Sequence, residues 1–453
     1  MTSDMHDPKS DNKLREAIFK YASERLDFNP PPLDGPRSPE QLASDVGNTI
    51  TEKGLGGEKA LELFAEKLAP ATISVDHPGF LSFIPAAPTD AASLFDLVVS
   101  ASSIYGGSWL EGAGAVYAEN QVLSFLAEEV GFPQDSGGVF VQGGTLGNLS
   151  ALTVAREQAR QRLGDKDFTI ICSEEAHSSV SMVAKVIGTQ VTKADSGESG
   201  KIGYSSAQKA AEQARQDGLI PMAIVGTAGT TNFGIVDDLE GLAQLAQELQ
   251  VWFHVDGAYG IAGALVPELK PLFVGIEKAD SFIVDPHKWL FAPFDACALV
   301  YRNPELAKRT FSQHGEYLEP INKSTEWNPS DYAFNLSRRA RGLPLWFSLA
   351  AHGVEKYRSA IRSNVELAHK ISDEIASRPQ LRLVRKPELS IVVFEVLGWD
   401  MSDYEKWSMG LLDEGLALVL PSSLRGRPHT RFAIVNPQTS MQLLTEILDS
   451  IRK

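Results

Sequence analysis

The sequence predicts an α/β protein with a mostly parallel central sheet and a smaller α/β domain at the C-terminus. From about Gly137 onward, short apolar runs rich in branched residues alternate with longer amphipathic runs, as strands and crossover helices do. After about Ser377 the pattern changes and a second, shorter set of strands and helices follows. With 453 residues, the chain is long enough for two or three domains with sizeable cores.

The N-terminal residues predict a helical arm. Segments 14–21 and 57–68 have helical patterns, and a stretch rich in Pro and Gly, residues 29–39, separates them. We therefore expect an N-terminal helical arm at residues 1–75, a large domain at 76–345 and a small C-terminal domain at 346–453.

Six apolar runs in the large domain predict strands: 138–141, 168–172, 223–225, 251–255, 281–284 and 296–301. Between the third and fourth runs, leucines recur at helical spacing over 237–250, and Asp237 with Glu240 is expected to cap the start of this helix. A helix that contains Trp346 is expected to run to about Ser377. It is followed by strands at 381–384 and 390–396, a helix at 404–414 and a strand at 431–435.

Composition argues against several classes of protein. With 42 Lys and Arg against 58 Asp and Glu, the formal charge of −16 offers no basic surface for nucleic acid. No apolar run approaches the roughly 20 residues that cross a bilayer, and residues 1–13 lack a secretory signal's apolar stretch. Two cysteines, Cys172 and Cys297, are too few for a disulfide framework or a four-thiolate metal site. We expect a cytoplasmic protein without nucleic-acid, membrane or metal sites.

A glycine-rich segment, residues 142–148, lies between a predicted strand and the following helix. Glycines let the backbone approach a ligand, and the N–H groups at a helix start attract phosphate. The segment contains Gly144, Thr145 and Leu146 but ends without the Lys of a nucleoside-triphosphate P-loop. It is consistent with a phosphate site or with a tight turn alone.

An acid and an amine follow two other predicted strands. Asp256 ends one strand, where a carboxylate would be costly to bury without a partner. Lys288 lies between His287 and Trp289, where we expect desolvation to lower its pKa and make the amine nucleophilic. Alone, Asp256 would be read as a turn cap and Lys288 as a solvated side chain. Together with a phosphate-type loop, they are the parts that pyridoxal 5'-phosphate needs.

His177 follows the predicted strand at 168–172. An imidazole there can lie flat on a pyridine ring and hold a substrate carboxylate, or it can cap the next helix.

The order of these segments resembles the pyridoxal-phosphate-dependent group II amino-acid decarboxylases, which include the aromatic-L-amino-acid and glutamate enzymes. The resemblance covers most of the chain, through residues 77–80, 107–109, His177, Thr230 with Thr231, Asp256 with Ala258, 285–289, 338–341 and 436–437. It implies fold type I of the pyridoxal-phosphate enzymes, that cofactor, and decarboxylation of an L-amino acid to the amine and carbon dioxide.

The resemblance also implies roles around the cofactor ring. Lys288 forms the Schiff base and Asp256 pairs with the ring nitrogen. His177 stacks on one face of the ring and orients the bond to be broken, Ala258 lies against the other face, and Thr231 lies nearby.

The phosphate is expected to bind the main chain of Gly144, Thr145 and Leu146, with His287 nearby. Family members often carry Asn where this chain has Asp285. An anionic side chain would be repelled by phosphate, so Asp285 is doubtful as a phosphate ligand.

Tyr317 resembles the Tyr on a mobile loop that delivers a proton to Cα in this family. Relatives that release an aldehyde typically have Phe at this position, so Tyr317 favours release of the amine. The surrounding stretch, residues 315–329, has the composition of a flexible lid or of a plain exposed loop.

Residues Phe83, Ile84, Pro85 and Ala86 align with the pocket that receives the substrate in aromatic decarboxylases. The expected lining, which comprises Phe80, Phe83, Ile84 and Trp109, is apolar and aromatic, and hence predicts an aromatic or bulky apolar substrate. Ala86 departs from the pattern, since it has no hydroxyl where such enzymes can have Thr.

Other functions are compatible with the sequence. An acidic substrate would need an Arg in the pocket, and Arg338, Arg339 and Arg341 are available. A fold-type-I aminotransferase or lyase could use the same Lys288 and Asp256, and a catalytically silent interaction protein could share the scaffold. By resemblance, the arm and the lid imply a homodimer with active sites at the subunit interface.

Overall fold

The computed structural model describes residues 12–85, 87–313, 326–424 and 426–451. Their contacts define two compact units. The larger unit comprises residues 83–397 and 431–437, and the smaller comprises residues 1–82, 398–430 and 438–453. The expected division at residues 75 and 345 follows chain order instead, and it stays a prediction.

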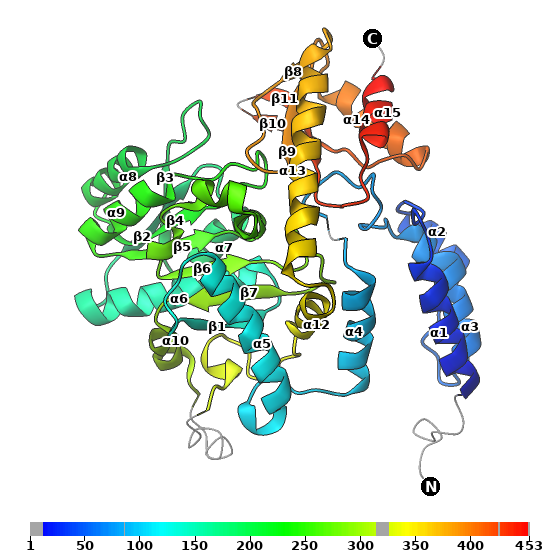
Figure 1. The fold of residues 1–453 in the computed structure, drawn as a ribbon, viewed down its shortest axis with the longest axis horizontal. Coiled ribbons are helices and arrows are strands. Elements are labelled where there is room, and N and C mark those ends of the chain that lie inside the picture. Colours follow the sequence, from blue (N-terminus) through cyan, green and yellow to red (C-terminus); the bar gives the residue numbers. More distant parts are fainter. Residues whose placement is uncertain (1–11, 86, 314–325, 425, 452–453) are drawn as a thin grey trace. The chain divides into compact units, whose positions relative to one another are not determined.

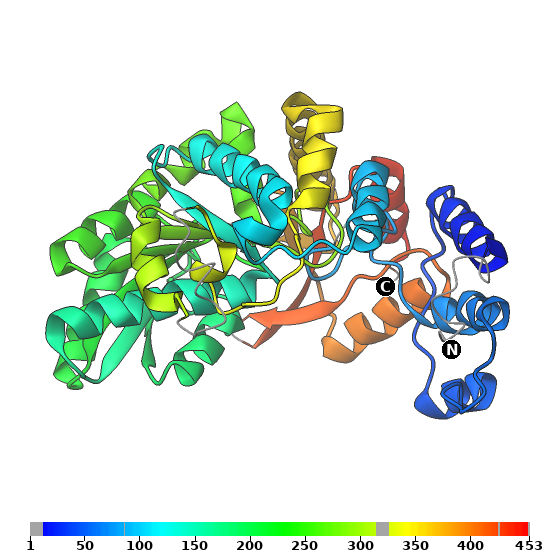
Figure 2. The same ribbon diagram turned by 90° about the horizontal axis from the view of Figure 1, so that it is seen from below.

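The larger unit is built on a seven-stranded sheet with helices on both faces (Figures 1 and 2). The strand order is β1-β7-β6-β5-β4-β2-β3. All neighbours from β3 to β6 pair in parallel, whereas β7 is antiparallel to both β6 and β1. The strands are β1 (Gly137–Val141), β2 (Phe168–Ser173), β3 (Gln190–Ala194), β4 (Ile220–Thr227), β5 (Trp252–Asp256), β6 (Ser281–Val284) and β7 (Cys297–Tyr301). The predicted α/β fold class is confirmed, as are the positions of all six predicted strands.

Strand β3 was not predicted from the sequence. It forms one edge of the sheet, and only the last of its five residues is buried. A short edge strand with a polar sequence leaves no apolar run to recognise.

Helices connect the strands and cover the sheet. Helix α6 contacts β4 to β7, whereas α8 and α9 contact strands from β2 to β5. The helices up to β7 are α4 (Asp90–Ala101), α5 (Trp109–Glu129), α6 (Gly144–Leu163), α7 (Ser178–Val186), α8 (Tyr204–Gln216) and α9 (Leu239–Leu249). After β7 come α10 (Pro304–Phe311), α12 (Leu343–His352), α13 (Val354–Ser377) and the antiparallel pair β8 (Leu381–Leu383) and β9 (Ile391–Val396).

The single long helix expected around Trp346 is wrong. Two helices, α12 and α13, meet at Gly353, whose φ of +77° lies in the left-handed region that favours glycine. Figure 1 shows the two axes pointing in different directions.

The expected cap of α9 is also wrong by one residue. Asp238, not Asp237, caps the helix and accepts the main-chain N–H of Gly241 at 3.0 Å. Asp237 is 2 % exposed and accepts the main-chain N–H groups of Ile202 at 2.9 Å and Thr227 at 2.8 Å. Its carboxylate therefore joins a loop to the end of β4.

The smaller unit contains the first and the last of the described residues. Its elements are α1 (Asn12–Leu26), α2 (Pro39–Val46), α3 (Gly57–Leu63), a π-helical turn (Phe64–Leu68), α14 (Met401–Asp413), β10 (Pro421–Leu424) and α15 (Met441–Asp449). Strand β11 (Arg427–Ala433) begins here, where it pairs with β10, and ends in the larger unit. Over the described part of the chain, no helix is long and apolar enough to span a membrane.

Candidate active site

A cavity of about 320 Å³ lies in the larger unit, lined by residues that follow β1, β2, β4, β5 and β6. Open α/β sheets place their ligands at this carboxyl edge. Eight of the predicted site residues line the cavity: Gly144, Thr145, His177, Thr231, Asp256, Ala258, His287 and Lys288. The structure thus brings the glycine-rich segment, the acid and the amine to one place.

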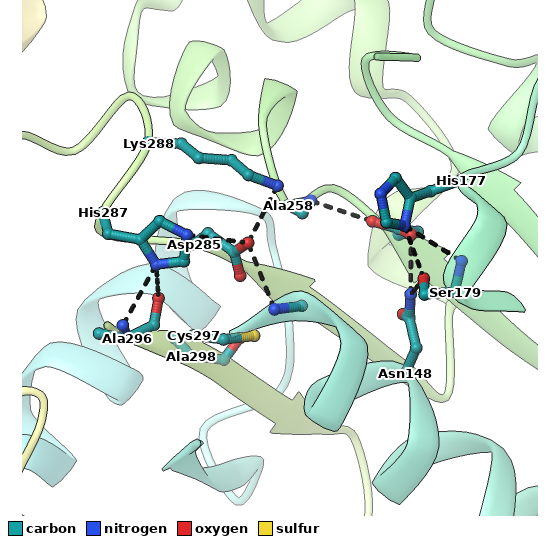
Figure 3. A network of polar contacts seen from close by, with 12 residues as sticks. Asn148, His177, Ser179, Ala258, Asp285, His287, Lys288, Ala296, Cys297 and Ala298 are labelled. Carbon is teal, nitrogen blue, oxygen red and sulfur yellow. Dashed lines mark hydrogen bonds and ion pairs between the residues drawn. The ribbon is translucent and has the colours of Figure 1, made fainter. Parts of the chain in front are cut away.

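Lys288 lies in the turn after β6, and its side chain extends toward Ala258 (Figure 3). Its Nζ is 3.0 Å from Oδ2 of Asp285, whose side chain is 2 % exposed. Burial alone would lower the pKa of Lys288, but the nearby carboxylates of Asp285 and Asp256 outweigh it and raise this pKa. The expectation of a lowered pKa is therefore wrong, because a buried carboxylate lies within ion-pair distance of the amine.

Asp285 also faces the glycine-rich segment. Its Oδ2 accepts the main-chain N–H of Gly144 at 3.3 Å and lies 3.7 Å from Nε2 of His287. Gly144 is the first residue of α6, so its N–H is among the donors that a helix start offers to an anion. The carboxylate thus occupies a donor that was expected to bind phosphate. Burial lowers the pKa of His287, whose Nδ1 lies 2.7 Å from the carbonyl oxygen of Ala296.

Asp256 ends β5 and is 6 % exposed. Oδ2 accepts a hydrogen bond from Nδ2 of Asn148 at 2.9 Å, and Oδ1 accepts the main-chain N–H of Ala258 at 3.2 Å. The partner that the sequence required for this carboxylate is therefore the amide of Asn148.

Of the two roles that the sequence left open for His177, the cap of the next helix is confirmed, and the contact with a cofactor ring and substrate stays a prediction. His177 caps α7, since its Nδ1 accepts the main-chain N–H of Ser179 at 3.2 Å, and its side chain lines the cavity. Because a main-chain N–H can only donate, Nδ1 of the neutral ring carries no proton and Nε2 carries it. Figure 3 shows His177, Ser179 and Asn148 grouped on the side of the site away from Asp285 and His287.

Five predicted site residues do not line the described cavity: Phe83, Ile84, Pro85, Trp109 and Leu146. The N–H of Leu146 donates to the carbonyl of Gly143 at 3.0 Å, and its side chain packs against the core. Binding roles for these residues stay predictions. Ala86 and Tyr317 lie outside the described residues.

The three arginines considered for an acidic substrate each pair with a carboxylate: Arg338 with Glu119 at 2.8 Å, Arg339 with Asp96 at 2.7 Å and Arg341 with Asp295 at 2.8 Å. Sequence reasoning missed a different arginine. Arg431 is 9 % exposed and donates to the carbonyl oxygen of Thr231, which lines the cavity. Burial lowers its pKa to about 10. A cation at the start of a predicted buried strand was the signal that could have identified it.

Sequence reasoning also assigned no role to Asn148 or Ser179. Both are buried cavity residues, at 1 % and 3 % exposed. Their positions, within the glycine-rich segment and two residues after His177, were the available signal.

The cavity suits pyridoxal phosphate. It offers the Lys288 amine for the aldehyde, Asp256 for the ring nitrogen and the start of α6 for the phosphate. Three buried atoms of lining residues, Oε1 of Gln142, Oγ1 of Thr227 and Oδ1 of Asp285, have no hydrogen-bond partner within the described part of the chain. Because buried polar atoms are rarely left unpaired, these atoms indicate a polar ligand.

Known proteins are similar in sequence to this chain over most of its length. The family model "pyridoxal-dependent decarboxylase conserved domain" matches residues 39–397. An aromatic-L-amino-acid decarboxylase of Bacillus atrophaeus is 30% identical over 91% of this chain and 88% of its own length. A histidine decarboxylase of Drosophila melanogaster is 29% identical over 85% of this chain and 48% of its own length.

Solved structures share the fold. Oryza sativa TDC, crystallised with PLP and tryptamine, superposes with a TM-score of 0.88 at 22% identity over 97% of this chain and 96% of its own. Mouse CSAD superposes with a TM-score of 0.90 at 22% identity over 98% of both chains. The fold is thus type I of the pyridoxal-phosphate enzymes. The family match and the cavity together lead to one conclusion: the chain belongs to the pyridoxal-dependent decarboxylases, enzymes that use pyridoxal 5'-phosphate to decarboxylate amino acids.

Proposed function

We propose that this decarboxylase acts on an aromatic or bulky apolar L-amino acid and releases the amine and carbon dioxide. The observation that carries the reaction is that Lys288, Asp256 and His177 line one cavity. The substrate class is supported by the relatives, which include aromatic-L-amino-acid, tryptophan and tyrosine decarboxylases. The apolar side chains of Phe83, Ile84 and Trp109, as aligned from the sequence, support it too.

When bound, pyridoxal phosphate supplies a protonated pyridine ring that accepts the electron pair left at Cα as carbon dioxide departs. Lys288 would hold the cofactor covalently, and the start of α6 with Thr145 would hold its phosphate. Asp256 would keep the proton on the ring nitrogen, so its role lies more in rate than in binding. Each oxygen of the Asp256 carboxylate accepts one hydrogen bond, from Nδ2 of Asn148 and from the main-chain N–H of Ala258, and these bonds fix the orientation of the carboxylate.

His177 would orient the substrate. The bond from Cα to the carboxylate must stand perpendicular to the ring, and a donor fixed in space can enforce this geometry. The proton on Nε2 of His177 is available for the carboxylate, because Nδ1 already accepts a main-chain N–H. Tyr317, known here only from the sequence, would return a proton to Cα.

A second candidate substrate has an acidic side chain, and Arg431 favours it. This buried arginine donates to the main chain of Thr231 beside the cavity, and no ion pair with a carboxylate is found for it among the residues described. A buried guanidinium can bind a substrate carboxylate through two parallel hydrogen bonds.

We also propose that the protein is a homodimer. In the larger unit, exposed apolar side chains gather on two helices: Leu94, Leu97 and Val98 on α4, and Leu110 and Tyr117 on α5. Clustered exposed apolar residues mark interaction surfaces more often than scattered ones do. Sedimentation analysis of the cofactor-loaded protein would give twice the chain mass if the proposal is right.

The test of the function is an assay of carbon dioxide and amine release with each of the 20 standard amino acids, without any keto-acid acceptor. We expect the largest kcat/KM for tryptophan, tyrosine, phenylalanine or histidine. A preference for aspartate or glutamate that is lost in Arg431→Leu would establish the second candidate instead. Turnover that needs a keto acid and releases no carbon dioxide would identify an aminotransferase.

A further inference from the structure

A chain of hydrogen bonds runs beneath the cavity, from Trp252 to Asp256. Nε1 of Trp252 donates to Oγ of Ser281 at 2.9 Å, and that hydroxyl lies 2.8 Å from Nδ1 of His254. Nε2 of His254 lies 2.9 Å from Oδ1 of Asn148, whose Nδ2 donates to Asp256 at 2.9 Å. All five residues are buried, with Ser281 and His254 at 0 % exposed.

The carboxylate end of this chain fixes the direction of the protons in it. An ionised carboxylate can only accept, so the amide of Asn148 turns its NH2 toward Asp256 and its oxygen toward His254. That oxygen needs a donor, so the single proton of neutral His254 is on Nε2. Nδ1 of His254 is then an acceptor, and the hydroxyl of Ser281, which accepts from Nε1 of Trp252, donates its own proton to it. Burial supports the neutral ring, since it lowers the pKa of His254 to about 4.

The amide of Asn148 also starts a second branch of the hydrogen-bond chain, toward His177. Its Nδ2 also donates to Oγ of Ser179 at 3.0 Å, and that hydroxyl lies 2.8 Å from Nδ1 of His177. Since Oγ of Ser179 already accepts from Asn148, its own proton is free to point at His177. One NH2 group therefore contacts Asp256 directly and His177 through one hydroxyl, and these are the residues expected to pair with the nitrogen of the cofactor ring and to stack on one of its faces.

We propose that Asn148 is a positioning residue that aligns Asp256 and His177 from a single amide, and that His254 fixes which way this amide faces. The inference rests on the proposed decarboxylase site, because it assumes that Asp256 and His177 act on cofactor and substrate. A reversed amide would turn its oxygen toward the carboxylate of Asp256 and leave Nε2–H of His254 facing another donor. The reversed orientation would therefore lose the hydrogen bonds that Asn148 donates to Asp256 and to Ser179.

The test uses Asn148→Asp in the cofactor-loaded protein, because Asp has the shape of Asn but donates to neither branch when ionised. Thr153→Val is the control. Thr153 is also buried on α6, and among the described residues its hydroxyl bonds only to the main chain of Leu149, at 2.8 Å. We expect Asn148→Asp to lower kcat by about 10- to 100-fold, as loss of hydrogen bonds to a charged group does, with KM within about threefold. Thr153→Val should change neither constant by more than about twofold.

A second readout does not depend on turnover. Spectra of protein labelled with 15N-histidine, with His254 assigned by its loss in His254→Gln, report which ring nitrogen is protonated. In the wild type we expect His254 to be neutral and protonated at Nε2 at pH 6. In Asn148→Asp the new carboxylate faces Nε2–H, so the titration midpoint of His254 should rise by one unit or more. Thr153→Val should leave it unchanged.

Each outcome decides the inference. A wild-type His254 protonated at Nδ1, or an unchanged titration in Asn148→Asp, would overturn the assigned direction of the chain. A folded, loaded Asn148→Asp with normal kcat would remove the positioning role. If Asn148→Asp does not fold, Ser179→Ala replaces it: kcat should fall while His254 stays as in the wild type, and a normal kcat would overturn the proposal. A wild type that decarboxylates no amino acid would instead refute the proposed function, and the histidine spectra would still decide the hydrogen-bond chain.

Discussion

Nζ of Lys288 and Oδ2 of Asp285 lie 3.0 Å apart in the turn that follows β6. The same carboxylate oxygen accepts the N–H of Gly144 at the start of α6. Asp285 therefore acts on both ends of the expected cofactor. It favours the charged form of the amine, which must lose a proton before it can attack an aldehyde, and it places a negative charge where phosphate is expected.

Replacing Asp285 by Asn should ease cofactor loading. Removal of the carboxylate lowers the pKa of Lys288 and ends the repulsion of phosphate, so the apparent Kd for pyridoxal phosphate at pH 7 should fall on the order of tenfold, equivalent to ~1.4 kcal/mol. Absorbance titrations across pH 6–9 measure this. The control is Asp295→Asn, which alters a cavity carboxylate paired with Arg341 instead of Lys288. Equal affinities in Asp285→Asn and the wild type would contradict the reasoning.

Replacing Lys288 by Ala should abolish the visible absorption of the bound cofactor together with the activity. Only a primary amine at this position can bond the aldehyde. Spectra of the purified protein and carbon dioxide release measure the two effects. Lys193→Ala serves as control, because Lys193 is an exposed lysine that does not line the described cavity and donates to the carbonyl of Ser173 in the sheet. If Lys288→Ala retains both the absorption and the activity, Lys288 is not the residue that bonds the cofactor.

Replacing Asp256 by Ala should slow carbon dioxide release more than it weakens cofactor binding. The carboxylate keeps the ring nitrogen protonated as negative charge develops, so its loss acts on the barrier; we expect a fall of 100-fold or more in kcat, ~2.7 kcal/mol. The change in cofactor Kd should be smaller. Single-turnover carbon dioxide release and cofactor titration are compared on the same preparation. The reverse ranking would count against Asp256 as the partner of the ring nitrogen.

Six of the seven strands of the large sheet, and the charged cavity residues at strand ends, could be predicted from the sequence for a physical reason. Buried strands such as β5 and β6 leave continuous apolar runs, and a charged residue at their ends is conspicuous, as Asp256 and Lys288 are. The pKa direction of Lys288 could not be predicted, because it depends on where Asp285 points.

Polar residues that act through other polar residues were likewise not predictable. Asn148 and Ser179 have ordinary sequence contexts, and only the folded chain brings them between Asp256 and His177. The break between α12 and α13 was not predictable either. The sequence has a continuous helical pattern there, and the left-handed φ of Gly353 that divides it is visible only in the structure.

Replacing Tyr317 by Phe should divert product from the amine toward an aldehyde or toward transamination of the cofactor. The phenol is the proton donor that the sequence resemblance assigns to Cα, and Phe cannot supply that proton. Amine and aldehyde are quantified by chromatography after equal release of carbon dioxide. Tyr332→Phe is the control, because its ring stacks on Trp327 and belongs to the core. An unchanged yield of amine would contradict the role of Tyr317 as the proton donor to Cα.

Replacing Asp237 by Asn should change how stability depends on pH. Burial raises the pKa of Asp237 to about 7, despite the two main-chain N–H groups that it accepts. The folded protein therefore holds this proton more tightly than the unfolded chain, whose carboxyl has a pKa of about 4. The contribution of Asp237 to stability is full below pH 4, falls by about 1.4 kcal/mol per pH unit above it, and is lost above pH 7.

Asp237→Asn cannot titrate and loses one acceptor at every pH, so its stability should lack this slope and gain on the wild type between pH 5 and pH 7. Urea denaturation at half-unit pH steps measures the difference. Asp238→Asn is the matched control, because Asp238 caps α9 next to it through a bond to Gly241 that Asn can also accept. It should keep the slope, with the upper end moved slightly to lower pH, because the charge of Asp238 is the smallest of the causes that raise the pKa of Asp237. Parallel curves for Asp237→Asn and the wild type would show that Asp237 is ionised in the folded protein throughout this range, held by the N–H groups of Ile202 and Thr227 more strongly than burial opposes it.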